Sequence, residues 1–95
     1  MGFFSNFAIK SGRRNFTALV LTEVRLKLEQ ELGRELDLKS LTPSMVTVAE
    51  KIFNEDLAPH ISGHPSNYKI KMQEAHQRAV DAICDAIADA LDAFG

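Results

Sequence analysis

The stretch from Ser66 to Phe94 constrains the fold most, because it is the longest segment with a helical apolar period and contains no proline. On a wheel that turns about 100° per residue, its apolar residues fall on one half of a helix. A helix of this length reaches roughly 40 Å, whereas a compact chain of this size has a radius of gyration of about 12 to 13 Å. Such a helix is either bent or extends beyond its own fold, where an apolar face needs a second chain to cover it.

This predicted helix has three sides of different character. A flank of small residues would let another helix backbone approach closely, and a flank of bulky residues would fill a core. A row of acids with no cation among them would be solvated or would dock a basic partner. Near the helix C-terminus these charges oppose the macrodipole and destabilise the helix. The small flank is Ala75, Ala79, Ala82, Ala86 and Ala93, the bulky flank is Val80, Ile83, Ile87, Leu91 and Phe94, and the acidic row is Asp81, Asp85, Asp89 and Asp92.

The first predicted helix carries two apolar stripes. Asn15 is a plausible N-cap, and Gly33 a plausible stop. Leu19 and Leu26 lie seven residues apart on a side of their own and form a second, narrower seam. Because a helix with two apolar sides is usually sandwiched between neighbours, we expect this leucine seam to contact a partner or a second copy. The main stripe is Val20, Leu21, Val24, Leu28 and Leu32.

Capping residues set the other boundaries. Thr42 followed by Pro43 predicts the start of a second helix, with a capping hydroxyl and a proline in its first turn. Ser66 or Asn67 can cap the third helix, after a loop rich in proline and glycine. The second helix would bury Met45, Val48, Ala49, Ile52 and Phe53. The predicted division of one helical domain is 1–14 N-terminal arm, 15–33 helix 1, 34–42 extended connector, 43–56 helix 2, 57–66 loop and 67–94 helix 3.

The first residues combine aromatic and basic side chains. Phe3, Phe4 and Phe7 open the chain, and Ser11 with Gly12 breaks the pattern before two arginines. Exposing three aromatic rings to water is unfavourable, so residues 1–14 are predicted to fold onto the core or onto a neighbouring subunit. Two alternatives use the cations of this segment, either at a membrane surface or in weak, salt-sensitive binding to nucleic acid. The three cations are Lys10, Arg13 and Arg14.

Length and composition limit the class of protein. The chain has 95 residues, enough for one domain with a modest core, and its 45% apolar content argues against disorder. Its single cysteine, Cys84, excludes an intrachain disulfide and is expected to serve in packing. No run approaches the roughly 18 apolar residues of a membrane span. We therefore expect a cytoplasmic protein without a membrane span.

The residue patterns give little sign of chemistry. His60 and His64 are four residues apart, but the prolines and glycine around them disfavour a helix, so a metal site is not expected. His76 lies within the bulky flank and is expected to be a core or interface histidine, with a pH-sensitive interface as the alternative. No phosphate loop, nucleophile elbow or dinucleotide fingerprint is present. We therefore expect no cofactor and no enzymatic activity.

One segment resembles a known attachment site in part. Lys39, Ser40 and Leu41 stand just before a helix, as does the Asp-Ser-Leu sequence of acyl carrier proteins, which are also small, helical and acidic. That resemblance implies a phosphopantetheine on Ser40. However, Lys39 replaces the aspartate and Pro43 follows closely, so attachment at Ser40 is not expected.

These observations predict an all-α, three-helix bundle-like domain with a long C-terminal helix and an aromatic N-terminal arm, which forms a two-fold homodimer. The expected function is binding to itself and to another protein, as a small regulatory, adaptor or inhibitory protein. The alternative is a nucleic-acid accessory protein that uses Lys10, Arg13 and Arg14, and an acyl-carrier-like or other enzyme-associated protein comes third. The predicted partner-binding residues are Leu19, Leu26, Ala75, Ala79, Ala82, Ala86, Asp81, Asp85, Asp89 and Asp92.

Overall fold

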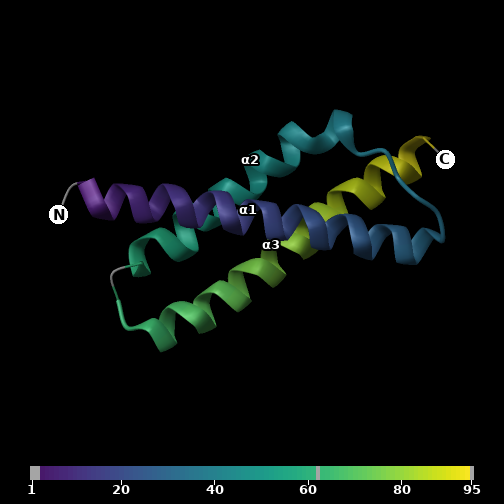
Figure 1. Cartoon of the computed structure of the whole chain (residues 1–95). Helices are drawn as coiled ribbons and strands as arrows, with labels where there is room; N and C mark the ends of the chain where they lie inside the picture. Colours follow the sequence, from purple (N-terminus) through teal and green to yellow (C-terminus); the bar gives the residue numbers. More distant parts are fainter. Residues whose placement is uncertain (1–2, 62, 95) are drawn as a thin grey trace.

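Three helices make up the fold in the computed structural model, which describes the backbone of residues 3–61 and 63–94 and the side chains of residues 8–61 and 63–90. Two of the helices, α1 and α3, have 30 residues each, and α2 has 11. Short 3₁₀ and π turns lie on either side of α2 (Figure 1). The elements are α1 Phe3–Leu32, η1 Lys39–Leu41, α2 Thr42–Ile52, η2 Phe53–Leu57, η3 Ala58–His60 and α3 Pro65–Phe94. The described residues are thus all-α, as predicted.

The molecule is elongated because two of its helices run most of its length. Its principal extents are 50 × 23 × 19 Å, and its radius of gyration is 14.7 Å, above the roughly 12 to 13 Å of a compact chain of this size. A 30-residue helix alone spans about 45 Å. α1 crosses both α2 and α3 (Figure 1). The prediction of a long C-terminal helix is confirmed, and α1 matches it in length.

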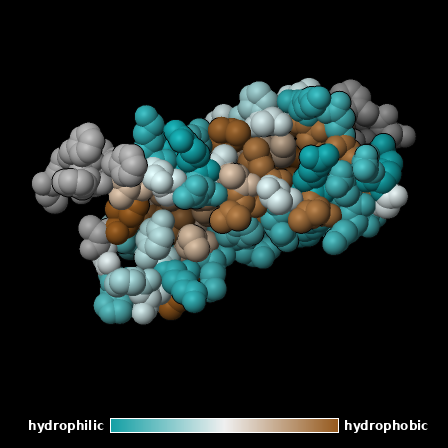
Figure 2. All heavy atoms as spheres, in the orientation of Figure 1, coloured by the Kyte–Doolittle hydropathy of each residue, from teal (hydrophilic) through white to brown (hydrophobic). Residues whose placement is uncertain are grey.

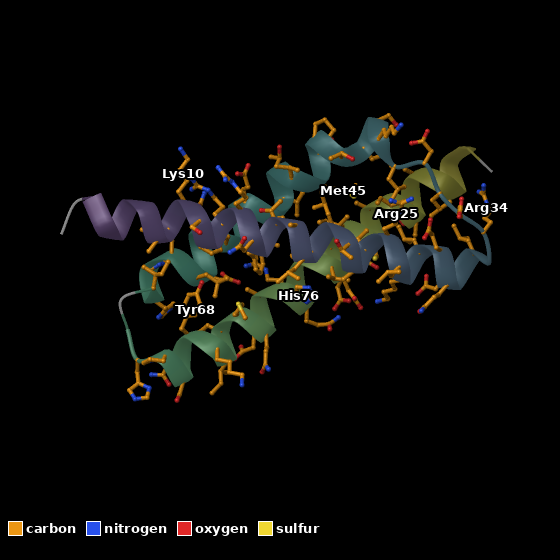
Figure 3. The ribbon with its side chains drawn as sticks, viewed as in Figure 1. Lys10, Arg25, Arg34, Met45, Tyr68 and His76 are labelled. Carbon is orange, nitrogen blue, oxygen red and sulfur yellow. The ribbon has the colours of Figure 1, made fainter. Side chains whose placement is uncertain are left out.

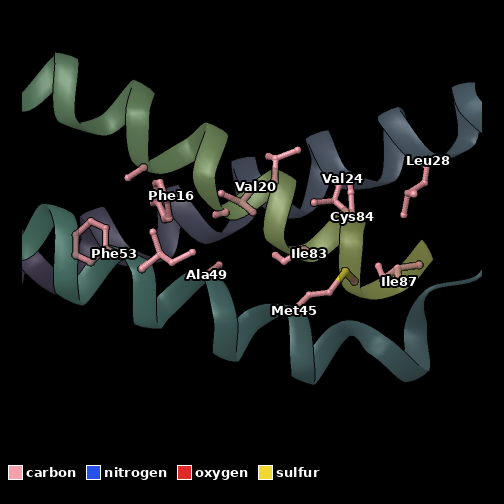
Figure 4. Packing of buried hydrophobic residues seen from close by; sticks show 14 of the residues in the cluster. Phe16, Val20, Val24, Leu28, Met45, Ala49, Phe53, Ile83, Cys84 and Ile87 are labelled. Carbon is pink, nitrogen blue, oxygen red and sulfur yellow. The ribbon is translucent and has the colours of Figure 1, made fainter. Parts of the chain in front are cut away.

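The core forms where the three helices cross (Figure 4). The predicted main stripe of α1 is confirmed in its first part, but Leu32 is 45% exposed. Steps of four residues turn the stripe by about 40° each, so the stripe has left the core face by the last turn of α1. The buried apolar residues are Phe16, Val20, Val24 and Leu28 of α1, Leu36 of the connector, Met45, Ala49, Ile52, Phe53 and Leu57 of α2 and η2, and Ala75, Ala79, Val80, Ile83, Cys84 and Ile87 of α3.

The N-terminal boundary of the first helix is a correction. The helix begins at Phe3, and Asn15 lies in its interior, so residues 3–14 are its first turns and not a separate arm. Gly12 faces the core, where a Cβ atom would lie 3.3 Å from Cζ of Phe53. The glycine therefore allows a close approach of the Phe53 ring and does not break the helix. The side chains of the first three phenylalanines lie outside the described residues.

Of the four predicted helix ends, only the stop at Gly33 is correct, since Asn15 lies inside α1. Gly33 has φ of 68°, and its N–H donates to the carbonyl of Glu29 at 2.8 Å, so it ends α1 as expected. Thr42 does not cap α2, because its hydroxyl donates to the carbonyl of Leu38 at 3.0 Å. At the start of α3, the N–H of Ser66 donates to Nδ1 of His64 at 3.2 Å. The capping acceptor is therefore a histidine that precedes Pro65, and neither Ser66 nor Asn67 plays this part.

The end of the second helix differs from the predicted 43–56. The N–H of Ala58 donates to the carbonyl of Phe53, which widens the helix into the π turn η2. Phe53 and Leu57 are both fully buried in this turn. On its outer side, Nη1 of Arg78 donates to both carboxylate oxygens of Asp56, at 3.0 and 2.9 Å. A charge-assisted pair of this kind fixes η2 against α3.

Gly12→Leu should lower the free energy of unfolding by about 1 to 3 kcal/mol, because added side-chain atoms overpack the contact with Phe53. Thermal and urea unfolding of the variant measure the effect. The matched control is Ser11→Leu, at an exposed position one residue earlier. Equal melting temperatures for the two variants would show that α1 does not pack on Phe53 at this position.

Candidate functional site

The leucine seam of α1 lies on the surface. Leu19 is 57% exposed, and Leu26 is 49% exposed. Thr22 lies between them, and its hydroxyl donates to the carbonyl of Ala18 at 2.9 Å. The surface between the two leucines therefore has no unsatisfied hydroxyl. Figure 2 shows that apolar side chains reach the surface along the middle of the molecule.

The small flank of α3 divides into a buried and an exposed part. Ala75 and Ala79 are 1% and 0% exposed, so the prediction that they bind a partner is wrong. They pack in the core of their own chain, because the small side chains let the neighbouring helical segments come close to α3. Ala82 and Ala86 are exposed, as a partner-binding flank requires. The side chain of Ala93 lies outside the described residues.

Ala86 borders an apolar groove between α2 and α3, which we call the α2–α3 groove. It encloses a hollow of about 120 Å³. A cavity of about 150 Å³ can hold a benzene molecule, so the hollow has room for one apolar side chain. The groove is lined by Leu41, Ser44, Met45, Val48, Ile83, Ala86, Ile87 and Ala90. Sequence patterns identified only Ala86 as a partner-binding residue among these.

The acidic row is only partly free. Asp81 accepts hydrogen bonds from Nζ of Lys27 at 3.5 Å and from Nε2 of Gln77 at 2.8 Å. Desolvation works to lower the pKa of Lys27, but the hydrogen bond and charge of Asp81 outweigh it, so that this pKa is raised. Asp85 and Asp89 are exposed, and no ion pair to either is found among the described side chains. The side chain of Asp92 falls outside the described part of the chain.

The three N-terminal cations border one hollow of about 260 Å³ between α1 and α2, which we call the basic hollow. Nη1 of Arg13 donates to Oδ1 of Asn54 at 3.0 Å, and its Nε lies 3.7 Å from Oε2 of Glu50. Lys10 and Arg14 are exposed. Figure 3 shows Lys10 near the N-terminal end of α1. The lining residues are Lys10, Arg13, Arg14, Thr17, Val46 and Glu50.

Another hollow lies between α1, the connector and α2 and measures about 460 Å³. Its polar lining is balanced in charge, since it includes Arg25 and Lys39 as well as Glu35 and Asp37. Arg25 is also paired with Glu29, at 3.4 Å between Nε and Oε2. The lining of this hollow therefore contains no cluster of like charges that would attract an oppositely charged ligand. The apolar floor of the hollow is Leu21, Leu36, Leu38 and Met45.

The remaining residues of chemical interest are separate from each other. The half-buried ring of His76 meets the ring of Phe16 edge-on, with 6.4 Å between centroids, so it lies at the margin of the core. Ser40 is exposed in η1. Among the described residues, His, Cys, Asp and Glu form no group of three or more that could hold a metal ion. Cys84 is buried, and this burial raises the pKa of its thiol.

Comparison with protein-family models, with curated proteins and with solved structures found no match to this chain. None of the described helices contains a segment long and apolar enough to cross a membrane.

The Cys84 thiol should react slowly with iodoacetamide, because it is buried and only the thiolate is a nucleophile. Since folding raises the pKa above its ordinary value of 9.0, the folded state holds the thiol proton more tightly than the unfolded chain does. Its contribution to stability is therefore present below that value and is lost as the pH rises through the folded pKa. Mass spectrometry should show much slower alkylation at about pH 8 in buffer than in denaturant. Similar rates would place the thiol on the surface.

Proposed function

We propose that the protein is a small, non-enzymatic protein-interaction module that acts as a helical homodimer in a regulatory, adaptor or inhibitory role. The observation that carries the proposal is the leucine seam of α1. Leu19 and Leu26 expose about half of their surface although the same helix already fills the core with its opposite side. Burying a leucine side chain stabilises an interface by about 1.5 to 3 kcal/mol.

The spacing of the two leucines suits a two-fold contact. In a dimer of this symmetry one surface patch meets its own copy. Two α1 helices packed antiparallel about an axis at Thr22 and Glu23 would set Leu19 of one copy against Leu26 of the other. Ala18 and Thr22 are small residues next to the seam, so the two helix backbones could approach closely.

Leu26→Asp should weaken dimerisation by at least about tenfold, because it places a charge in the apolar contact. Light scattering after gel filtration, over a range of protein concentrations, measures the change. The control is Ile70→Asp, which alters an equally exposed apolar residue of α3. A wild-type chain that stays monomeric at the highest concentration would contradict the homodimer.

The α2–α3 groove is the proposed site for another protein, which we expect to present an amphipathic helix with a basic flank. Asp89 is exposed and lies about 60° around α3 from Ala86, so one carboxylate stands beside the apolar lining, whereas Asp85 lies on the far side of the helix. Two copies joined through this groove would bring like charges together, which disfavours self-association there. A basic partner would instead neutralise Asp89 while its apolar face fills the groove.

Ala86→Leu should abolish binding of a synthetic amphipathic helix built from leucine and lysine, because the larger side chain fills the hollow. Fluorescence anisotropy of the labelled peptide measures binding. The variant should change the free energy of unfolding by no more than about 0.5 kcal/mol, since Ala86 is exposed.

Ala88→Leu is the matched control, at an exposed position of α3 outside the groove lining. A peptide with glutamate in place of lysine should not bind. Equal binding of the lysine peptide to both variants, or binding of the glutamate peptide, would contradict this use of the groove.

A nucleic-acid accessory role remains the second candidate, because Lys10, Arg13 and Arg14 share the basic hollow. Phosphate contacts by a few cations give binding that weakens steeply with salt.

A further inference from the structure

Thr17 borders the basic hollow, and the fold leaves its buried hydroxyl without a hydrogen-bond partner within the described chain. The residue is 9% exposed. The other three threonines each donate to the carbonyl four residues earlier. These bonds are Thr22 to Ala18 at 2.9 Å, Thr42 to Leu38 at 3.0 Å and Thr47 to Pro43 at 2.9 Å. Thr17 is the one threonine without such a bond, and it is also the one threonine that borders the basic hollow.

A buried hydroxyl without a partner is unfavourable, so the free donor of Thr17 indicates a ligand with an acceptor oxygen. Arginine and lysine side chains border the same hollow, with one acid, Glu50, among them. Glu50 lies nearest to Arg13, at 3.7 Å. The charges of Lys10 and Arg14 are therefore left to act on a ligand.

We propose that the basic hollow binds a phosphoryl group. The group would accept the hydroxyl hydrogen of Thr17 and charge-assisted hydrogen bonds from the exposed cations. Arginine, lysine and threonine are among the side chains that donate hydrogen bonds to phosphate oxygens. This inference does not depend on the homodimer, because all the lining residues come from one chain.

The size of the hollow limits how much of a ligand it can enclose. Sites for whole drug-sized molecules measure about 300 to 1,000 Å³, and this one measures about 260 Å³. The hollow therefore fits the charged group of a ligand, with the rest of the molecule outside. The phosphoryl group could belong to a free phosphate or to the backbone of a nucleic acid.

Titration followed by amide chemical shifts tests the proposal and separates the two sources. The probes are inorganic phosphate and a short single-stranded oligonucleotide without a terminal phosphate. Saturable shifts at residues 10–17 and 46–50 with inorganic phosphate would indicate a site for free phosphate. Saturable shifts in these segments with the oligonucleotide alone would indicate a site for the nucleic-acid backbone. The absence of shifts in these segments with both probes would overturn the proposal.

Three variants examine the individual groups. Thr17→Val and Arg14→Gln should each weaken binding by about tenfold, the effect of losing one hydrogen bond to a charged group. Thr17→Val should at the same time leave the melting temperature unchanged or higher, because the lost hydroxyl had no partner. Glu50→Gln should tighten binding by removing the acid of the hollow.

Lys69→Gln is the control, since this exposed lysine of α3 lies outside the hollow. If Lys69→Gln weakens binding as much as Arg14→Gln does, the attraction is a general effect of charge and the proposed site is wrong. A lower melting temperature of Thr17→Val would also count against it, because the hydroxyl would then have a partner within the fold.

Discussion

The contact of the Phe53 ring with α1 determines how the three helices are arranged. The ring is fully buried, lies 5.8 Å from the ring of Phe16 between centroids, and occupies the space that Gly12 leaves open. This contact ties the first half of α1 to the π turn at the end of α2. Leu19 and Leu26 follow Gly12 by seven and fourteen residues and therefore lie on nearly the same side of α1. They face solvent because they stand beyond the part of the helix that Phe53 covers.

Two long helices and one short helix cannot enclose all of their apolar surface. α1 and α3 have 30 residues each, whereas α2 has 11, so the core is confined to the region where they cross. Three of the described surfaces could bind a partner or a ligand, namely the leucine seam, the α2–α3 groove and the basic hollow. They differ in chemistry, since the seam is apolar, the groove has one acid, Asp89, beside it and the hollow is cationic. One small domain could therefore hold a second copy, a basic helix and a phosphoryl group at separate places.

Apolar periodicity correctly predicted features that depend on residues close in the sequence. It failed for features that depend on contacts between segments far apart in the sequence. It identified the three helices and the exposed seam, while the preference of glycine for helix ends identified the stop at Gly33. Gly12 was taken as a break, because the ring that needs this glycine lies 41 residues further along the chain. Periodicity could not tell whether Ala75 approaches its own chain or a partner, since small residues serve both purposes. The unpaired hydroxyl of Thr17 could not be predicted from the sequence, because the lack of a hydrogen-bond partner depends on the three-dimensional structure.

The antiparallel homodimer can be tested by disulfide cross-linking between copies. The variant carries Leu19→Cys and Leu26→Cys, with Cys84→Ala to remove the native thiol. On one helix the two positions are about 10 Å apart, too far for an intrachain disulfide, which needs Cα atoms within about 7 Å. We predict a covalent dimer in which mass spectrometry finds position 19 of one chain joined to position 26 of the other, while each single-cysteine variant stays uncrosslinked. A double variant that remains monomeric, or that joins only like positions, would contradict it.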